Sequence, residues 1–82
     1  IEPNELGVNI YPNPTKDVLC FDFSKKENTQ TEILDLNGRI LISKEILAHE
    51  NSISLKSLNN GIYFIRFTNK NGISIKKILV EK

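Results

Sequence analysis

The sequence predicts an all-β domain, an immunoglobulin-like antiparallel β-sandwich of about seven strands. Apolar residues alternate with polar ones at a period of two along most of the chain, which is the period of strands and not of helices. Turn-forming residues interrupt this alternation about every 8 to 12 residues. With 82 residues, 39% of them hydrophobic and 26% charged, the chain has the balance of one globular domain.

The first two predicted strands flank a proline-rich turn. Residues 8–11 alternate until Tyr-Pro-Asn-Pro at 11–14, where two prolines remove backbone donors and end the strand. Residues 18–23 alternate again, which predicts a half-buried strand with its larger side chains facing the core. Cys20 then faces outward or toward a neighbouring element.

A hairpin is predicted in the middle of the chain. A β-branched and aliphatic run, residues 29–36, ends at Asn-Gly, residues 37–38. Because both residue types tolerate positive φ, this pair predicts a type I′ turn. The return strand, residues 39–45, is expected to alternate its aliphatic side chains, with Ile40 and Ile42 on one face and Leu41 on the other.

Two further strands follow. Residues 51–55 alternate, and the segment Leu-Asn-Asn-Gly-Ile-Tyr at 58–63 leads through a turn into the next strand. Tyr63 is placed where a tyrosine corner would be, with its ring in the core and its hydroxyl bonded to the backbone of the preceding loop.

The final predicted strand has apolar side chains in two phases, Ile73 and Ile75 in one, Ile78 and Val80 in the other. A regular strand would put these two pairs on opposite faces. One extra residue near Lys76-Lys77 would return all four side chains to the core and turn both lysines outward. We therefore expect a β-bulge at this position.

Charge is divided unevenly along the chain, although the net charge is only +1. Residues 1–50 carry five Lys/Arg and nine Asp/Glu, and residues 51–82 carry six and one. Such an asymmetry can indicate an acidic partner, but in a sandwich the two halves interleave, which favours an ordinary solvated surface. No basic stripe interleaved with aromatics is present, and a nucleic-acid partner is therefore not expected.

The residues that carry chemistry are too few for a catalytic or metal site. A single cysteine, Cys20, and a single histidine, His49, match no zinc spacing and fall in a strand and a loop. The Asp-Leu-Asn-Gly segment at 35–38 lacks the spaced acids of a calcium loop. We expect no enzyme activity, no catalytic residue, no metal and no cofactor, and the role of Cys20 is left open.

The ends of the sequence suggest a processed piece of a longer protein. The sequence has no initial Met, no signal peptide and no run of 18 apolar residues, so no membrane span is expected. Residues 1–6 are read as a linker remnant and residues 7–82 as the domain. The apolar, lysine-bearing run at the end of the sequence is the candidate surface for another protein.

Four segments, in this order and spacing, resemble the C-terminal sorting domain, type A, of type IX secretion (Por secretion) cargo: Val8 to Pro14, Asp35 to Arg39, Leu58 to Tyr63, and Lys76 to Lys82. The resemblance extends over residues 8–82. It implies a domain that directs its cargo through the outer membrane to the cell surface, where a sortase-like protease usually removes it.

The resemblance also assigns roles and partners. It implies an N-terminal cargo domain, an outer-membrane secretion translocon and a sortase-like protease as partners, with passage through the periplasm. The shape-setting motif would be Pro12, Asn13, Pro14, Gly38, Gly61 and Tyr63. The candidate surface for the translocon would be Lys76, Lys77, Ile78, Leu79, Val80, Glu81 and Lys82.

Two other classes of function remain open from the residues alone. The first is an adhesion or carbohydrate-binding sandwich attached to a secreted enzyme, which would need an exposed aromatic pair or a calcium site. The second is a passive structural module, for which position in the chain would not matter.

Overall fold

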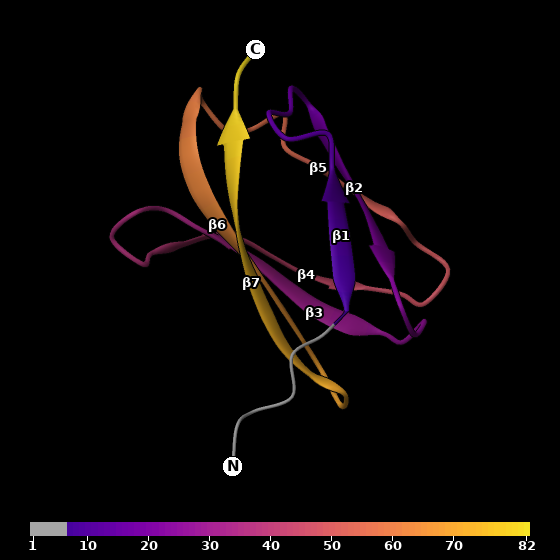
Figure 1. The fold of residues 1–82 in the computed structure, drawn as a ribbon. Coiled ribbons are helices and arrows are strands. Elements are labelled where there is room, and N and C mark those ends of the chain that lie inside the picture. Colours follow the sequence, from indigo (N-terminus) through magenta and orange to yellow (C-terminus); the bar gives the residue numbers. More distant parts are fainter. Residues whose placement is uncertain (1–6) are drawn as a thin grey trace.

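The computed structural model describes residues 7–82, and the regular elements of this part are seven β-strands. Their bounds are β1 Val8–Tyr11, β2 Val18–Phe23, β3 Thr29–Leu34, β4 Ile40–Ile46, β5 Ser52–Ser54, β6 Gly61–Asn69 and β7 Gly72–Val80. They form a three-stranded sheet of order β1-β2-β5 and a four-stranded sheet of order β4-β3-β6-β7 (Figure 1). All pairings within the sheets are antiparallel, so the predicted all-β sandwich is confirmed.

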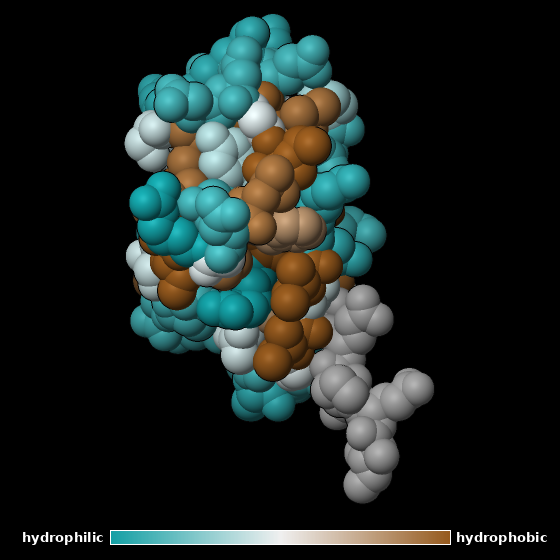
Figure 2. Space-filling model, turned by 90° about the vertical axis from the view of Figure 1, so that its left-hand side faces the viewer, coloured by the Kyte–Doolittle hydropathy of each residue, from teal (hydrophilic) through white to brown (hydrophobic). Residues whose placement is uncertain are grey.

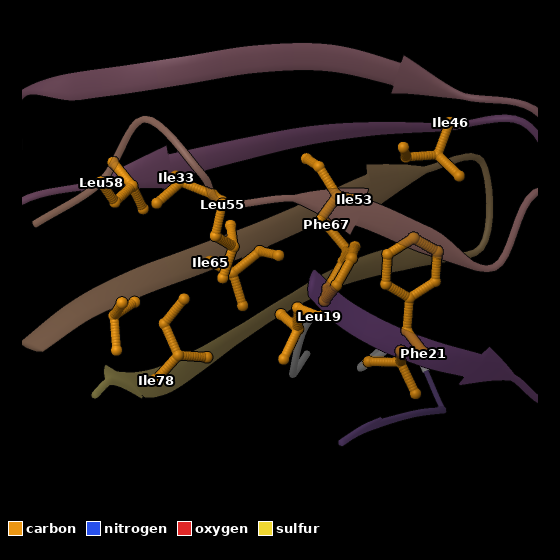
Figure 3. Close-up of a cluster of buried hydrophobic side chains, with 12 residues drawn as sticks. Leu19, Phe21, Ile33, Ile46, Ile53, Leu55, Leu58, Ile65, Phe67 and Ile78 are labelled. Atoms are coloured by element: carbon orange, nitrogen blue, oxygen red, sulfur yellow. The ribbon is translucent and has the colours of Figure 1, made fainter. Parts of the chain in front are cut away.

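The two sheets enclose one hydrophobic core, seen in close-up in Figure 3. Where the strands pair regularly, alternate side chains enter the core. Phe21, Phe23 and Phe67 form its aromatic part, with ring centroids 5.3–5.5 Å apart in tilted and edge-on pairs. The buried apolar residues are Val8, Leu19, Phe21, Ile33, Ile46, Ile53, Leu55, Leu58, Ile65, Phe67, Ile78 and Val80.

The chain crosses from one sheet to the other directly after β1. β1 pairs with β2, but Thr15 forms a parallel bridge with Val80, at the end of β7 in the other sheet. Between these points lie Pro12 and Pro14, each preceded by a cis peptide bond. The N-terminal segment therefore contacts both layers and covers one side of the sandwich.

The β3–β4 hairpin differs from the predicted type I′ turn. Only Gly38 has a positive φ, of 86°, and Asn37 does not. The Gly38 N–H donates to the Asp35 carbonyl at 3.0 Å, which closes a four-residue turn followed by a glycine in the left-handed region. The Asp35 carboxylate accepts the Asn37 N–H at 2.9 Å, and this contact favours the observed turn over the predicted one.

The turn shifts the register of β4. Ile33 pairs with Ile42 and Leu34 with Ile40, so Leu41 is left unpaired between them. Ile42 packs against the core whereas Ile40 is 46% exposed. The prediction that Ile40 and Ile42 share a face is therefore wrong, because the extra residue in β4 reverses the alternation.

Candidate recognition surface

β7 is the edge strand of the four-stranded sheet, and it is regular along its full length. Nine residue pairs join it to β6, from Gly61↔Val80 to Asn69↔Gly72, without a register shift. Lys76 pairs with Ile65 and Lys77 with Phe64. The predicted β-bulge at Lys76-Lys77 is therefore wrong.

Because the pairing is regular, the two pairs of apolar side chains in β7 lie on opposite faces of the sheet. Ile78 and Val80 are fully buried, as expected, but Ile73 and Ile75 are 46% and 57% exposed. The inner face takes Ser74 in their place, and its buried hydroxyl has no hydrogen-bond partner among the described residues. The predicted burial of Ile73 and Ile75 is wrong because the sheet keeps its pairing with β6 and leaves these side chains outside.

The seven candidate residues of the C-terminal run thus occupy different environments. Ile78 and Val80 hold the strand to the core and cannot touch another protein unless the domain opens. Lys76 is half-buried on the inner face. The exposed members are Lys77, Leu79, Glu81 and Lys82.

Lys82 is folded back onto the domain. Its backbone N–H donates to the side-chain oxygen of Asn60 at 3.0 Å, and its Nζ donates to the Lys56 carbonyl at 3.0 Å. Its ammonium also lies 3.8 Å from a carboxylate oxygen of Asp17. Lys82, two residues after the end of β7, is therefore held against the segment before β6.

The outer face of the four-stranded sheet carries an apolar band, which Figure 2 shows running along the molecule. Across the β6–β7 pair, Leu79 lies opposite Ile62 and Ile75 lies opposite Arg66. Arg66 is engaged with Glu32, whose carboxylate accepts from Nε at 2.8 Å and from a terminal nitrogen at 2.6 Å. The exposed or half-buried apolar side chains of this face are Leu34, Ile40, Ile62, Phe64, Ile73, Ile75 and Leu79.

One half of the free edge of β7 is covered by the proline-rich segment. The Asn13 side chain donates to the Lys77 carbonyl at 3.1 Å and accepts the Leu79 N–H at 3.0 Å, as a peptide group of a neighbouring strand would. The Thr15 backbone continues this pattern, with its N–H donating to the Leu79 carbonyl and its carbonyl accepting the Glu81 N–H, both at 2.8 Å. We call these contacts the clasp.

Along the other half of that edge, residues 7–82 provide no pairing partner. Within residues 7–82 the clasp residues Asn13 and Thr15 are the groups that pair with β7 on the side away from β6. Beside the open part lies a cleft of about 440 Å³. Its lining comes from β1, from the end of β2 and from β7: Gly7, Val8, Asn9, Asp22, Phe23, Ser24 and Lys76.

The remaining shape-setting residues support the turns around β6. The Tyr63 hydroxyl donates to the Asn59 carbonyl at 2.7 Å while its ring packs against the core, which confirms the expected bond to the preceding loop. Gly61 begins β6, and Gly38 provides the left-handed position of the β3–β4 turn. These residues fix loops and do not converge on a common pocket with Asn13.

Among residues 7–82, three titratable groups have shifted pKa values, and none of them belongs to β7. The backbone N–H of Arg39 lowers the pKa of Asp35 below 3.8, and the N–H of Leu47 lowers that of Glu50 below 4.5. The negative charge of Asp22 raises the pKa of Tyr11 above 10.0. The first two shifts keep carboxylates ionised where they hold loop backbones.

Neither a metal-binding cluster nor a membrane-spanning helix is found in residues 7–82. Residues 7–82 contain no group of three or more His, Cys, Asp or Glu side chains arranged to hold a metal ion. No helix of this part is long and apolar enough to cross a bilayer. Cys20 is a free, half-buried thiol on β2, paired in register with Ser52.

Sequence reasoning missed the role of Asn13 and the outward position of Ile73 and Ile75. A plain alternation counted back from the buried Val80 places Ser74 inside and both isoleucines outside, and this signal was available. The Asn13 contacts join residues 64 and 66 positions apart, and no local pattern indicates such a pairing.

Comparisons with known proteins agree with this architecture. A family model described as a secretion system C-terminal sorting domain matches residues 9–81. Beta-agarase D of Zobellia galactanivorans is 28% identical over 79 residues, which are 96% of this chain and 16% of the agarase. The chain therefore spans a small part of the length of this curated relative.

Proposed function

Starting from the fact that the chain belongs to the family of secretion system C-terminal sorting domains, we propose that β7 and the outer face beside it form the surface that the secretion machinery recognises. Domains of this family are C-terminal sorting signals of type IX secretion. The chain is such a signal, and it directs export through the outer membrane to the cell surface or the medium. A domain of this family acts as a sorting signal and not as a catalyst.

The apolar band on the outer face is the observation that supports this surface. The inner face of the same sheet already forms the core, so side chains such as Ile75 and Leu79 contribute little to folding where they are. Contiguous exposed apolar patches on a soluble domain often mark sites of interaction. A partner that covers the band would remove this surface from water.

Charged residues next to the band supply orientation. Lys77 lies on the outer face opposite Phe64, and Glu81 follows the end of the strand. Such rim charges guide association and select the partner more than they add affinity. Among the candidate residues, Lys77, Leu79, Glu81 and Lys82 would make contact, whereas Lys76, Ile78 and Val80 would hold the strand in place.

The remaining partners are those that the family implies. The proposed outer-membrane translocon recognises the domain, and a cargo domain precedes it. We place the linker to that cargo at residues 1–6, outside the described residues, and the domain at 7–82. A sortase-like protease would cut in or before this linker, and any enzyme activity of the whole protein would belong to the cargo.

A reporter fusion tests the recognition surface. The 82-residue chain is placed behind a periplasm-targeted reporter in a host with type IX secretion, and export is measured by fractionation. Leu79→Glu puts a charge into the apolar band, and we expect the reporter to stay in the periplasm. Val18→Glu is the matched control, because Val18 is similarly exposed, at 44%, on the other sheet.

The outcome depends on both variants being folded, which circular dichroism of the purified chains establishes. Normal export of Leu79→Glu, or equal loss with Val18→Glu, would contradict the proposed surface. Deleting residues 78–82 is less informative, because it removes two fully buried side chains of the core together with the exposed ones.

A further inference from the structure

The free edge of β7 has a covered half and an open half, and the open half has the properties of a strand-binding site. We propose that a partner protein adds one extended, acidic and apolar segment to this edge at residues 73–77, by backbone hydrogen bonding. The proposal rests on the proposed function, because it specifies how a recognition partner would engage β7.

The backbone geometry comes from the clasp. Both the N–H and the carbonyl of Leu79 point away from β6, toward Asn13 and Thr15. In a regular strand this direction repeats every second residue, so Ile73, Ile75 and Lys77 point the same way. The Asn13 side chain already donates to the Lys77 carbonyl. The groups that remain for a partner strand are the Lys77 N–H and the N–H and carbonyl groups of Ile73 and Ile75.

The clasp also shows that this edge accepts a neighbour. The Asn13 amide and the Thr15 backbone already extend the sheet beside residues 77–81, and Thr15 bridges to Val80 in the parallel sense. An edge of unpaired backbone groups is a template for pairing with another chain. The open half continues the same regular strand where the chain's own neighbour ends.

Side chains around the open half define the chemistry of the segment. On the outer face, Ile73 and Ile75 would meet apolar side chains of the added strand. On the inner face, alternate side chains would enter the cleft beside Phe23 and Lys76. Among residues 7–82 neither Lys76 nor Lys77 has a carboxylate within ion-pair distance, so an acidic residue would complement them.

The same lysines argue against a second copy of this chain as the occupant. Antiparallel pairing of two β7 strands about Ile75 would place Lys76 opposite Ser74 of the other copy. The two Lys76 side chains would then be diagonal neighbours, with Cβ atoms roughly 7–8 Å apart on the same face. Like charges so placed disfavour pairing, whereas an acidic segment gains from both lysines.

Amide hydrogen exchange of the 82-residue chain tests the proposal directly. The probe is an acetylated, amidated hexapeptide alternating Glu and Val, and the control alternates Lys and Val. In the free chain we expect fast exchange at Ile75 and slow exchange at Leu79, which the clasp covers. At saturating Glu-Val peptide the Ile75 amide should slow by about tenfold or more, with no change for the Lys-Val peptide.

Three results would overturn strand addition. The first is unchanged exchange at Ile75 with the Glu-Val peptide. The second is protection that rises with protein concentration in the absence of peptide, since it would identify a second copy as the occupant. The third is protection confined to another part of the domain.

A backbone variant separates this inference from the proposed function. Ile75→Pro removes the outward N–H but leaves the bonds of its neighbours to β6, as is tolerated on an edge strand. Ile75→Thr shortens the same side chain and keeps the N–H. We expect Ile75→Pro to abolish the peptide's effect and export of the reporter, and Ile75→Thr to retain both.

Normal export of folded Ile75→Pro, with Leu79→Glu still blocked, would overturn strand addition and leave the recognition surface intact. Normal export of both variants would overturn the two proposals together. If Ile75→Pro does not fold, the exchange experiment on the unmodified chain still decides the inference.

Discussion

The four-stranded sheet has two edge strands, β4 and β7, which differ in how readily another chain could pair with their unpaired backbone groups. β4 contains a register shift at Leu41, and its Lys44 is 3.7 Å from Glu50 in an ion pair. β7 pairs regularly over nine residue pairs and exposes isoleucines. An irregular, charged edge discourages pairing with other chains, whereas a flat, apolar edge invites it.

The difference indicates which edge is available to a partner. β4 has a bulge and charged residues, which natural sheets use to protect an edge. The Asp35 carboxylate holds its hairpin loop by accepting the N–H groups of Asn37 and Arg39. β7 has lysines but no bulge, and only half of its length is covered by the clasp. Under the proposals made above, β7 is the edge available to a partner and β4 is the protected edge.

The largest expected effect comes from a buried side chain of β7, compared with an exposed side chain of β4. Ile78→Ala on β7 removes a fully buried side chain and should lower the free energy of unfolding by about 2–5 kcal/mol. Ile40→Ala on β4, where the side chain is 46% exposed, should cost less than about 1 kcal/mol. Urea unfolding measures both, and equal losses would mean that Ile78 is not buried in the core as described.

A smaller effect is expected from the clasp. Asn13→Ala leaves the Leu79 N–H and the Lys77 carbonyl to water, and we expect a loss of about 1 kcal/mol with faster amide exchange at Leu79. Asn13→Asp keeps an acceptor for the Leu79 N–H and should preserve its protection better. Identical exchange at Leu79 in all three chains would show that Asn13 does not cover this edge.

Truncation of Ser74 should raise the free energy of unfolding, in contrast to the substitutions above, which lower it. Its buried hydroxyl has no partner among the described residues, so Ser74→Ala removes a desolvated polar group at the expense of a small void. We expect the free energy of unfolding to rise by about 0.5–1 kcal/mol. Ser57→Ala, at an exposed position, is the control and should change little. A clear loss of stability in Ser74→Ala would indicate that the hydroxyl is bonded in solution.

The smallest effect concerns pH at the base of the β4 hairpin. The pKa of Asp35 is lowered below 3.8 in the folded chain, chiefly by the Arg39 N–H. Its contribution to stability is therefore fully present above the unfolded pKa and is lost as pH falls through the folded value. Urea unfolding at pH 7 and below pH 3.8 should show the difference between the chain and Asp35→Asn shrinking in acid. A difference independent of pH would contradict this account.

The sequence predicted the seven strands and most of the core, because alternation and turn residues are local signals. It failed where two arrangements satisfied the same local pattern. In β7 the apolar side chains change phase, and either a bulge or two exposed isoleucines accommodates the change. In β4, Ile40 and Ile42 are in one phase, and nothing in the sequence indicates the extra residue at Leu41. The structure puts the extra residue beside Gly38, where the turn already offsets the strands, and leaves Ile73 and Ile75 exposed.

The candidate surface was predictable as a segment but not as a set of contacts. The C-terminal run does form an edge strand, yet Ile78 and Val80 are core residues, and the apolar band also draws on Ile62 of β6. Sheet order decides which strand lies at an edge, and sheet order depends on long-range pairing. The clasp depends on it as well, since Asn13 and Leu79 are 66 positions apart.

The parallel bridge of Thr15 with Val80 has a mechanical consequence. The start of β1 and the end of β7 lie toward opposite ends of the sandwich (Figure 1). Tension between a cargo pulled from the β1 side and a machine gripping β7 would slide these segments past each other. The hydrogen bonds of Thr15 to Leu79 and Glu81 run across the direction of that sliding motion. The pulling force would therefore act on both bonds at once, in shear. Since resistance to forced unfolding is set by the rate of unfolding, this short bridge would help the domain to remain folded while it is pulled.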